Sequence, residues 1–384
     1  MTLTETDTTE TLRQEIRSWL SSTLTELRGD DANVRRTEEE EIDLRLQYAR
    51  RLARDGWVGL SWEPRWGGRG MTFAEQLVFH QESVRADAPD PLCRMGTDIM
   101  GPAIAVYGTE EQRERFLPPT LAVDIIWCQG FSEPGAGSDL ASLSTRATRD
   151  GDGWRINGQK IWTTLAQYAD YCLLLARTDP DVRPHAGISA FAVDMQAPGV
   201  KVAPIEQITG LHEFSEVFYD NVYVPDECLI GEPGLGWKFA MTALEFERSI
   251  NFMARQVRLG KDVADLVARA RRHPDRIPSR IKDRLVDVYV KSQQLQATID
   301  FHIDALVRGE RPGSEANATK VFWSETNQEL TDLGAEIDSL IGERPATGND
   351  WAQMYLQARA NTIYAGASEI QRNIIAERGL GMPR

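Results

Sequence analysis

The periodicity of apolar residues changes twice along the chain, and this change restricts the fold more than any other feature. In the first and last parts of the sequence, apolar residues recur at the spacing of amphipathic helices packed on one another. Between them, short alternating or apolar runs are separated by Gly, Pro and Asp, as is typical of strands. The sequence therefore predicts an α+β protein with an N-terminal helical domain (1–122), a middle β-barrel or sandwich domain (123–232) and a C-terminal four-helix bundle (233–384).

The charge balance excludes several classes of partner. The 58 acidic residues outnumber the 43 basic residues and give a net charge of −15, so general attraction to nucleic acid or to an anionic bilayer is not expected. The N-terminus is acidic and polar, and no apolar run approaches the length of a membrane span. We expect a soluble, cytoplasmic protein without membrane insertion.

The residue patterns of several common kinds of enzyme site are missing from this sequence. The histidines are scattered, the four cysteines lie far apart without a C-x-x-C pair, and no protein-held metal is expected. A phosphate-binding Walker A loop, a dinucleotide-binding G-x-G-x-x-G and a hydrolase G-x-S-x-G are also missing. Redox chemistry with a cofactor held in another way remains open.

Two segments of the β region carry residues suited to a planar ligand. In the run 131–139 (FSEPGAGSD), small residues would let backbone amides and hydroxyls approach a ring that carries carbonyl oxygens, although such a run is also an ordinary turn. The run 157–164 (NGQKIWTT) predicts a hairpin turn at Asn157–Gly158 followed by a strand with Trp162, Thr163 and Thr164. The indole fits either the core or a flat wall against a ring.

Taken together, these motifs and the C-terminal run 363–384 (IYAGASEIQRNIIAERGLGMPR) resemble the acyl-CoA dehydrogenase family over practically the whole chain. The resemblance implies FAD as cofactor, an acyl-CoA substrate desaturated between its α and β carbons, and an electron-transfer flavoprotein as acceptor. It implies cofactor contacts for Gln129, Phe131, Ser132, Trp162, Thr164 and Glu369, and substrate contacts for Ser138 and Arg248.

The position of the catalytic base departs from the commonest pattern of the family. Proton abstraction beside a thioester needs a carboxylate shielded from water, which many members supply as the Glu of a Y-E-G-T motif. Here that position is Ala365, whereas the L-x-x-E-R motif used by other members places Glu247 on the first long helix of the last domain. Its helical neighbours are mostly apolar, and we predict Glu247 as the base. An ion pair within the bundle is the alternative role, and Glu369 is a rival base.

Two further departures bear on ligands. The R-x-x-F-G motif that usually meets the diphosphate of FAD is missing, and Arg271, Arg272 and Arg276 could replace it or form a solvated surface loop. Alanine at 365 leaves volume for a bulky or branched acyl group, and the overall pattern is similar to the bacterial branch that includes steroid side-chain dehydrogenases.

Members of that branch often work as heteromers in which one subunit carries the glutamate, so we expect a homo- or hetero-oligomer, a dimer or a tetramer. The alternatives to a dehydrogenase are a flavin oxidase or monooxygenase on the same fold, or a subunit that completes a partner's site.

Overall fold

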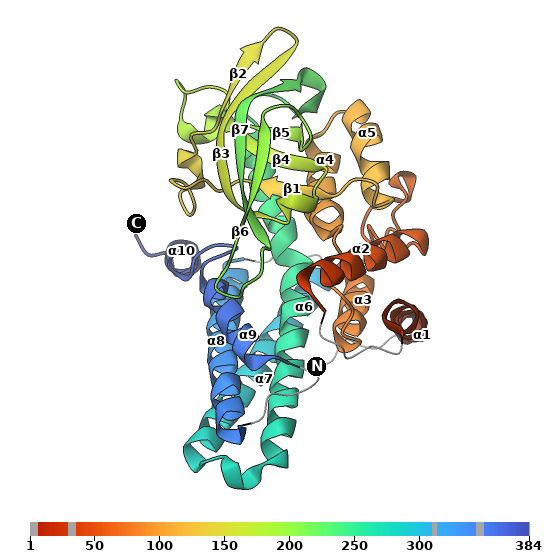
Figure 1. Ribbon diagram of the computed structural model, residues 1–384, viewed down its shortest axis with the longest axis vertical. Helices are drawn as coiled ribbons and strands as arrows, with labels where there is room; N and C mark the ends of the chain where they lie inside the picture. Colours follow the sequence, from red (N-terminus) through yellow and green to blue (C-terminus); the bar gives the residue numbers. More distant parts are fainter. Residues whose placement is uncertain (1–6, 30–35, 309–312, 343–348, 384) are drawn as a thin grey trace. The chain divides into compact units, whose positions relative to one another are not determined.

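The computed structural model describes residues 7–29, 36–308, 313–342 and 349–383; within these ranges the side chains of residues 7, 8, 247–253, 306 and 307 are outside the description. Helices come first in the sequence, strands follow, and long helices complete it (Figure 1). The predicted fold class, with an N-terminal helical part, a middle β part and a C-terminal helical part, is confirmed.

Three of the helices that precede the sheet begin in the same way. The hydroxyl of a threonine before α2, α3 and α5 accepts a hydrogen bond from the backbone N–H three residues on, and the side-chain oxygen of the Glu or Gln at that position accepts one from the threonine's own N–H. A short 3-10 turn at Pro64–Trp66 lies in the connection between α2 and α3. The helices are α1 (Asp7–Arg28), α2 (Glu38–Arg54), α3 (Phe73–Arg85), α4 (Gly101–Tyr107) and α5 (Glu110–Leu121).

The β part is a mixed eight-stranded sheet in the order β6-β7-β3-β2-β4-β5-β8, with β1 paired to β4 off this path. Most pairs are antiparallel, but β1 and β2 each run parallel to β4. The central part of β4 is buried on both faces, which explains its continuous apolar run. The strands are β1 (Trp127–Gly130), β2 (Arg146–Asp150), β3 (Gly153–Thr164), β4 (Tyr171–Arg177), β5 (Ile188–Asp194), β6 (Val200–Ile205), β7 (Phe214–Pro225) and β8 (Leu229–Ile230).

The predicted hairpin turn at Asn157–Gly158 is wrong, because both residues lie inside β3. The chain turns earlier, between β2 and β3, where Gly151 takes a φ of 62°. Gly158 marks a shift in the β3–β7 register instead, and a Cβ added there would meet the Oγ1 of Thr145 at 2.4 Å. The glycine is required by close approach of the neighbouring strand rather than by a turn.

The last third of the chain is helical, and α7, α8 and the later part of α6 share an apolar core that includes Leu266, Leu295 and Leu330. A Cβ added to Gly334 would overlap the ring of Trp351, so this glycine allows α8 and α9 to approach closely. The helices are α6 (Gly236–Arg272), α7 (Ser279–Val307), α8 (Glu315–Ile341), α9 (Trp351–Ala358) and α10 (Ser368–Ile374).

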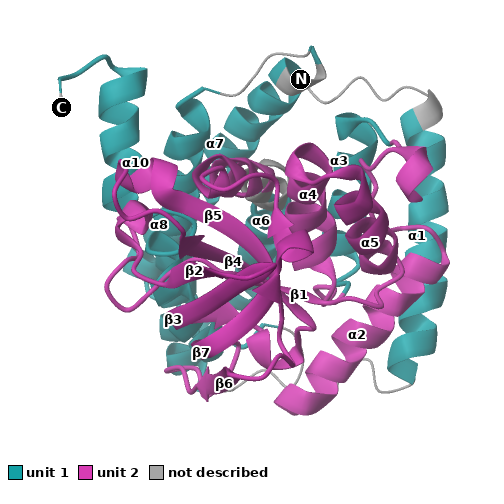
Figure 2. Ribbon diagram, turned by 90° about the horizontal axis from the view of Figure 1, so that it is seen from above, with its two compact units in different colours: residues 1–35, 71–88, 248–384 teal, residues 36–70, 89–247 magenta. Residues whose placement is uncertain are grey.

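By internal contacts the chain divides into two compact units, coloured in Figure 2. One unit holds residues 1–35, 71–88 and 248–384, and the other holds 36–70 and 89–247. The division at 122 and 232 stays a prediction. Among the described helices none is long and apolar enough to cross a membrane, and the same residues contain no cluster of three or more potential metal ligands.

Candidate functional site

The two motifs of the β region are joined by hydrogen bonds. The backbone N–H of Ile161 donates to the carbonyl of Ser132 at 3.0 Å, and the Nζ of Lys160 donates to the carbonyl of Phe131 at 3.0 Å. Phe131 is buried with 5% of its surface exposed, and Ser132 is half-buried. The segment that follows β1 is thus fixed to the end of β3, although the two are distant in sequence.

A buried ion pair holds this junction together. The Oε1 of Glu133 lies 2.8 Å from the Nζ of Lys160, and the same carboxylate accepts the backbone N–H groups of Ser144 and Thr145 and the hydroxyl of Ser144 at 2.6–2.9 Å. Burial alone would raise the pKa of Glu133, but Lys160 and these donors outweigh it and lower the pKa to about 2. The carboxylate is therefore ionised and saturated with partners, which suits a structural role rather than proton transfer.

The strand is distorted where the predicted ring-binding residues lie. The β3–β7 register shifts between Lys160 and Thr163, and Trp162 within this bulge has a φ of 59°. A bulge redirects a side chain out of the normal alternation. The indole of Trp162 is 55% exposed and meets the ring of Phe214 edge-on, while Thr163 beside it is fully buried. A large aromatic face is thus presented outward on a rigid strand.

The Gly-Ala-Gly-Ser turn next to this junction is open. Glu133 and Ala136 exchange two backbone hydrogen bonds, which close the turn. Gly135 and Gly137 do not have positive φ values, and a Cβ added to either would meet nothing within 4 Å. Neither the backbone conformation nor packing among the described residues requires these glycines. An exposed Ser138 follows, so the turn leaves room for a molecule to approach its backbone.

The remaining predicted residues of the sheet are partly accessible. Gln129 lies on β1 opposite Leu173 of β4 and is half-buried. Thr164 ends β3 opposite Phe214 and is also half-buried. The buried Oγ1 of Thr163 has no hydrogen-bond partner among the described residues. The structure thus places Phe131, Ser132, Trp162 and Thr164 at one junction of the sheet.

The predicted base and its neighbour fall on α6. The backbone of Glu247 and Arg248 is helical, but their side chains lie outside the described residues, so their predicted roles stay predictions. The alternative position, Ala365, lies in the loop before α10 with a φ of 52°. Glu369 in the first turn of α10 is exposed to solvent.

The three arginines suggested as ligands of the FAD diphosphate are exposed or bonded to another part of the chain. Arg271 and Arg272 end α6 and are exposed, and Arg276 donates to the carbonyl of Ile341, where it caps the end of α8. Their suggested role toward a phosphate has no support from these contacts.

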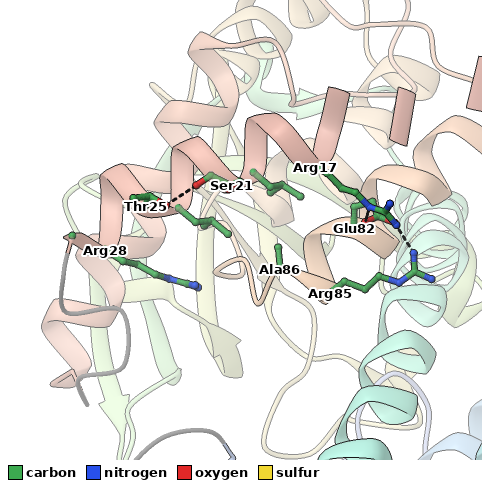
Figure 3. A pocket seen from close by; sticks show the side chains of 10 residues that line it. Arg17, Ser21, Thr25, Arg28, Glu82, Arg85 and Ala86 are labelled. Carbon is green, nitrogen blue, oxygen red and sulfur yellow. Dashed lines mark hydrogen bonds and ion pairs between the residues drawn. The ribbon is translucent and has the colours of Figure 1, made fainter. Parts of the chain in front are cut away.

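A pocket of about 450 Å³ lies elsewhere, beside α1 and α3, and contains none of the predicted site residues. It is lined by Leu20 and Leu24 together with arginines around the buried Glu82 (Figure 3). Glu82 bonds Arg13, Arg17 and Arg85, so this charge cluster ties α1 to α3.

Sequence reasoning assigned no role to Glu133 and Lys160, although both lie within the two quoted motifs. The sequence signal for this pair was a charged residue, Lys160, at a strand position whose side chain is directed into the core by the alternation of β3. A buried lysine requires a partner, and an acidic residue in the companion motif supplies it.

Comparisons with known proteins cover the whole chain. The family models described as acyl-CoA dehydrogenase N-terminal, middle and C-terminal domains match residues 6–124, 128–222 and 234–380.

Individual relatives match over nearly their full length. The protein described as acyl-CoA dehydrogenase IpdE1 of Mycobacterium tuberculosis is 40% identical over 384 residues, which covers 98% of each chain. The solved structure of the Tcur3481-Tcur3483 steroid acyl-CoA dehydrogenase shares 34% identity and a TM-score of 0.87 over 100% of both chains. The ChsE4-ChsE5 complex from Mycobacterium tuberculosis shares 31% identity and a TM-score of 0.80, also over 100% of both chains.

Proposed function

Because the chain belongs to the acyl-CoA dehydrogenase family, we propose that it binds FAD and desaturates an acyl-CoA thioester, with Glu247 as the base for the α proton. The observation that carries the cofactor proposal is Trp162, whose indole is 55% exposed on a bulged strand beside the open turn at 133–138. An exposed aromatic face held rigidly in this way fits a planar ring. A flavin held there would supply the acceptor for the hydride that leaves the β carbon.

The chain's own residues have separate roles in this proposal. Backbone groups at Phe131 and the hydroxyl of Ser132 would bond the polar edge of the cofactor ring, and Thr164 would donate near its reacting atom. Ser138, at the exposed end of the turn, would contact the pantetheine part of the thioester. Glu369 and Gln129 would make further cofactor contacts.

Glu247 is proposed as the base for two reasons that support each other. Alanine at 365 cannot accept a proton, so the carboxylate must come from another element. Glu247 lies one turn beyond the fully buried Ala243 on α6, and an apolar surrounding raises the basicity of a carboxylate. Arg248 would contact the substrate.

The substrate class follows from the relatives and from Ala365. A steroid acyl-CoA dehydrogenase is among the similar structures, and the alanine leaves volume for a bulky acyl group. We propose a bulky or branched thioester, such as one derived from a steroid side chain. Two similar structures are described as two-component assemblies, which supports a heteromer as one candidate state, with Glu247 marking this chain as the catalytic subunit. Electrons would leave to an electron-transfer flavoprotein.

The test is anaerobic mixing of the purified protein with a panel of acyl-CoA esters that includes steroid side-chain thioesters. We expect rapid bleaching of the flavin with at least one of them. Glu247→Gln should keep its flavin and lose turnover by about 10²–10⁴-fold. Glu245→Gln, on an exposed neighbour in the same helix, is the matched control and should leave turnover unchanged.

Retained turnover in Glu247→Gln would overturn the assignment, and the same assay on Glu369→Gln would then test the rival base. Absence of bleaching with every thioester would instead favour an oxidase or monooxygenase. A colourless protein that becomes yellow and active only with a sister subunit would mark a chain whose site is completed by its partner.

A further inference from the structure

The helix α7 buries one face and leaves the opposite face exposed. Its inward residues, which include Ile281, Val288 and Leu295, belong to the apolar core of the C-terminal helices. On the outward face, Val286 and Phe301 are 59% and 66% exposed. A surface helix of a globular protein usually carries polar side chains on the face that meets water. The outward face of α7 departs from this pattern.

The outward apolar residues of α7 form one stripe. They are separated by four, seven and four residues, spacings that keep side chains on the same side of an α-helix. All of them are exposed, and they are Val286, Val290, Ala297 and Phe301. The stripe runs for about 22 Å along the helix axis, at a rise of about 1.5 Å per residue. Isolated exposed apolar side chains are common, but a row of them marks an interaction surface.

This stripe is symmetric about its own middle. The exposed pair Gln293–Gln294 lies between its two halves. Val290 and Ala297 each lie three residues outside this pair. Val286 and Phe301 each lie seven residues outside it. When a second α7 is laid beside the first in the antiparallel direction, Val290 therefore falls opposite Ala297, and Val286 falls opposite Phe301.

Such a pattern fits a second copy of the chain as the occupant of this face. A two-fold contact needs a surface that is complementary to itself, so that residue i meets residue j and j meets i. The stripe of α7 meets this condition along its whole length. At its centre the side chains of Gln293–Gln294 can bond each other across the axis, because an amide carries both donors and an acceptor. A polar pair within an apolar helix seam fixes the register.

Each end of the stripe carries a cation beside acidic groups. Lys282 and Asp283 are exposed just before the first valine, and Asp304 lies three residues beyond Phe301. In the antiparallel register, the layer of Lys282 in one copy faces the layer of Asp304 in the other. The ammonium thus lies beside one carboxylate from each helix and offsets their mutual repulsion.

We propose that two copies of this chain associate through α7, in an antiparallel two-fold contact centred between Gln293 and Gln294. The driving force is the removal of the valine and phenylalanine side chains from water. The proposal names a surface, a partner and a register, none of which the proposed function contains. It uses residues of α7 alone, so it stands whether or not the chain desaturates an acyl thioester.

The first experiment measures the mass of the purified full-length protein by sedimentation velocity. We expect an even number of copies in the wild type and half that mass in Phe301→Asp, because each α7 contact would bury two unpaired carboxylates. Ile208→Asp places the same charge on an exposed isoleucine between β6 and β7 and is the matched control. It should keep the wild-type mass. Circular dichroism of both variants checks that their helices are intact.

The second experiment tests the register by disulfide cross-linking, with copper phenanthroline as the oxidant. In the double variant Val290→Cys/Ala297→Cys, each new thiol faces the other one on the second copy, and we expect a covalent dimer. In either single variant the two equivalent thiols lie about 10 Å apart along the axis, too far for a disulfide. The single variants should therefore stay unlinked. The four natural cysteines are buried and should not react.

A wild-type protein that sediments as a single chain would refute the proposal. An unlinked double variant would refute it too, as would a single variant that links as well as the double one, since the register would then be wrong. If the mass rises only when a different chain is added, a sister subunit covers α7 and the proposal fails. Neither readout involves flavin, so absence of flavin bleaching tests the proposed dehydrogenation separately.

Discussion

The ammonium of Lys160 and the carboxylate of Glu133 lie 2.8 Å apart with side-chain exposures of 0% and 4%. Lys160 also bonds the carbonyl of Phe131, so a single buried cation fixes the segment after β1 to the end of β3. The exposed indole of Trp162 follows two residues later. The geometry of the candidate cofactor site thus depends on an ion pair that is itself buried.

Replacement of Glu133 by glutamine should destabilise the protein strongly. The substitution leaves Lys160 buried without its counter-charge, and breaking a buried pair from one side costs about 3–5 kcal/mol. The measurement is the free energy of unfolding from urea denaturation. Glu227→Gln removes an exposed partner of Arg115 and should cost at most about 1 kcal/mol. Equal losses in the two variants would contradict a structural role for the buried pair.

The same pair predicts a dependence of stability on acid. The pKa of Glu133 falls from its ordinary 4.5 to about 2 in the folded protein, so the unfolded state binds the proton more readily between these values. The stabilisation by the carboxylate is complete above pH 4.5 and is lost as the pH falls toward 2. The difference in free energy of unfolding between wild type and Glu133→Gln should therefore shrink across this range. A constant difference between pH 3 and pH 7 would disprove this cause.

Loss of the indole at 162 should affect the cofactor more than the fold. Trp162→Ala removes an aromatic face that is 55% exposed, so the free energy of unfolding without cofactor should change by less than about 1 kcal/mol. The Kd of FAD should rise at least tenfold, and Trp162→Phe should restore much of the affinity because it keeps an aromatic ring. Unchanged affinity in Trp162→Ala would remove Trp162 from the cofactor site.

A second buried carboxylate offers an independent test of stability. Burial would raise the pKa of Glu82, but hydrogen bonds from Arg17, Arg13 and Arg85 lower it, and its side chain is only 3% exposed (Figure 3). Glu82→Gln should cost about 3–5 kcal/mol, measured by urea unfolding, since it leaves three arginines around an uncharged amide. Glu10→Gln, on a more exposed partner of Arg13, is the control and should cost less than about 1 kcal/mol.

The sequence by itself determined the order of helices and strands, because periods of about 3.6 and 2 residues are local properties of the chain. It also identified the family, since the motifs at 131–139, 157–164 and 363–384 are contiguous runs. The one local prediction that failed was the turn at Asn157–Gly158: an Asn-Gly pair favours a hairpin, but pairing of β3 with β7 continues past it.

Only the tertiary structure decided which buried charges have partners. Lys160 and Lys320 are both lysines that the fold shields from water, and nothing in their local sequence separates them. Lys160 bonds Glu133 from another segment, whereas the described residues supply no partner for the Nζ of Lys320. Desolvation and pairing depend on contacts between segments distant in sequence, so periodicity and motifs do not encode them.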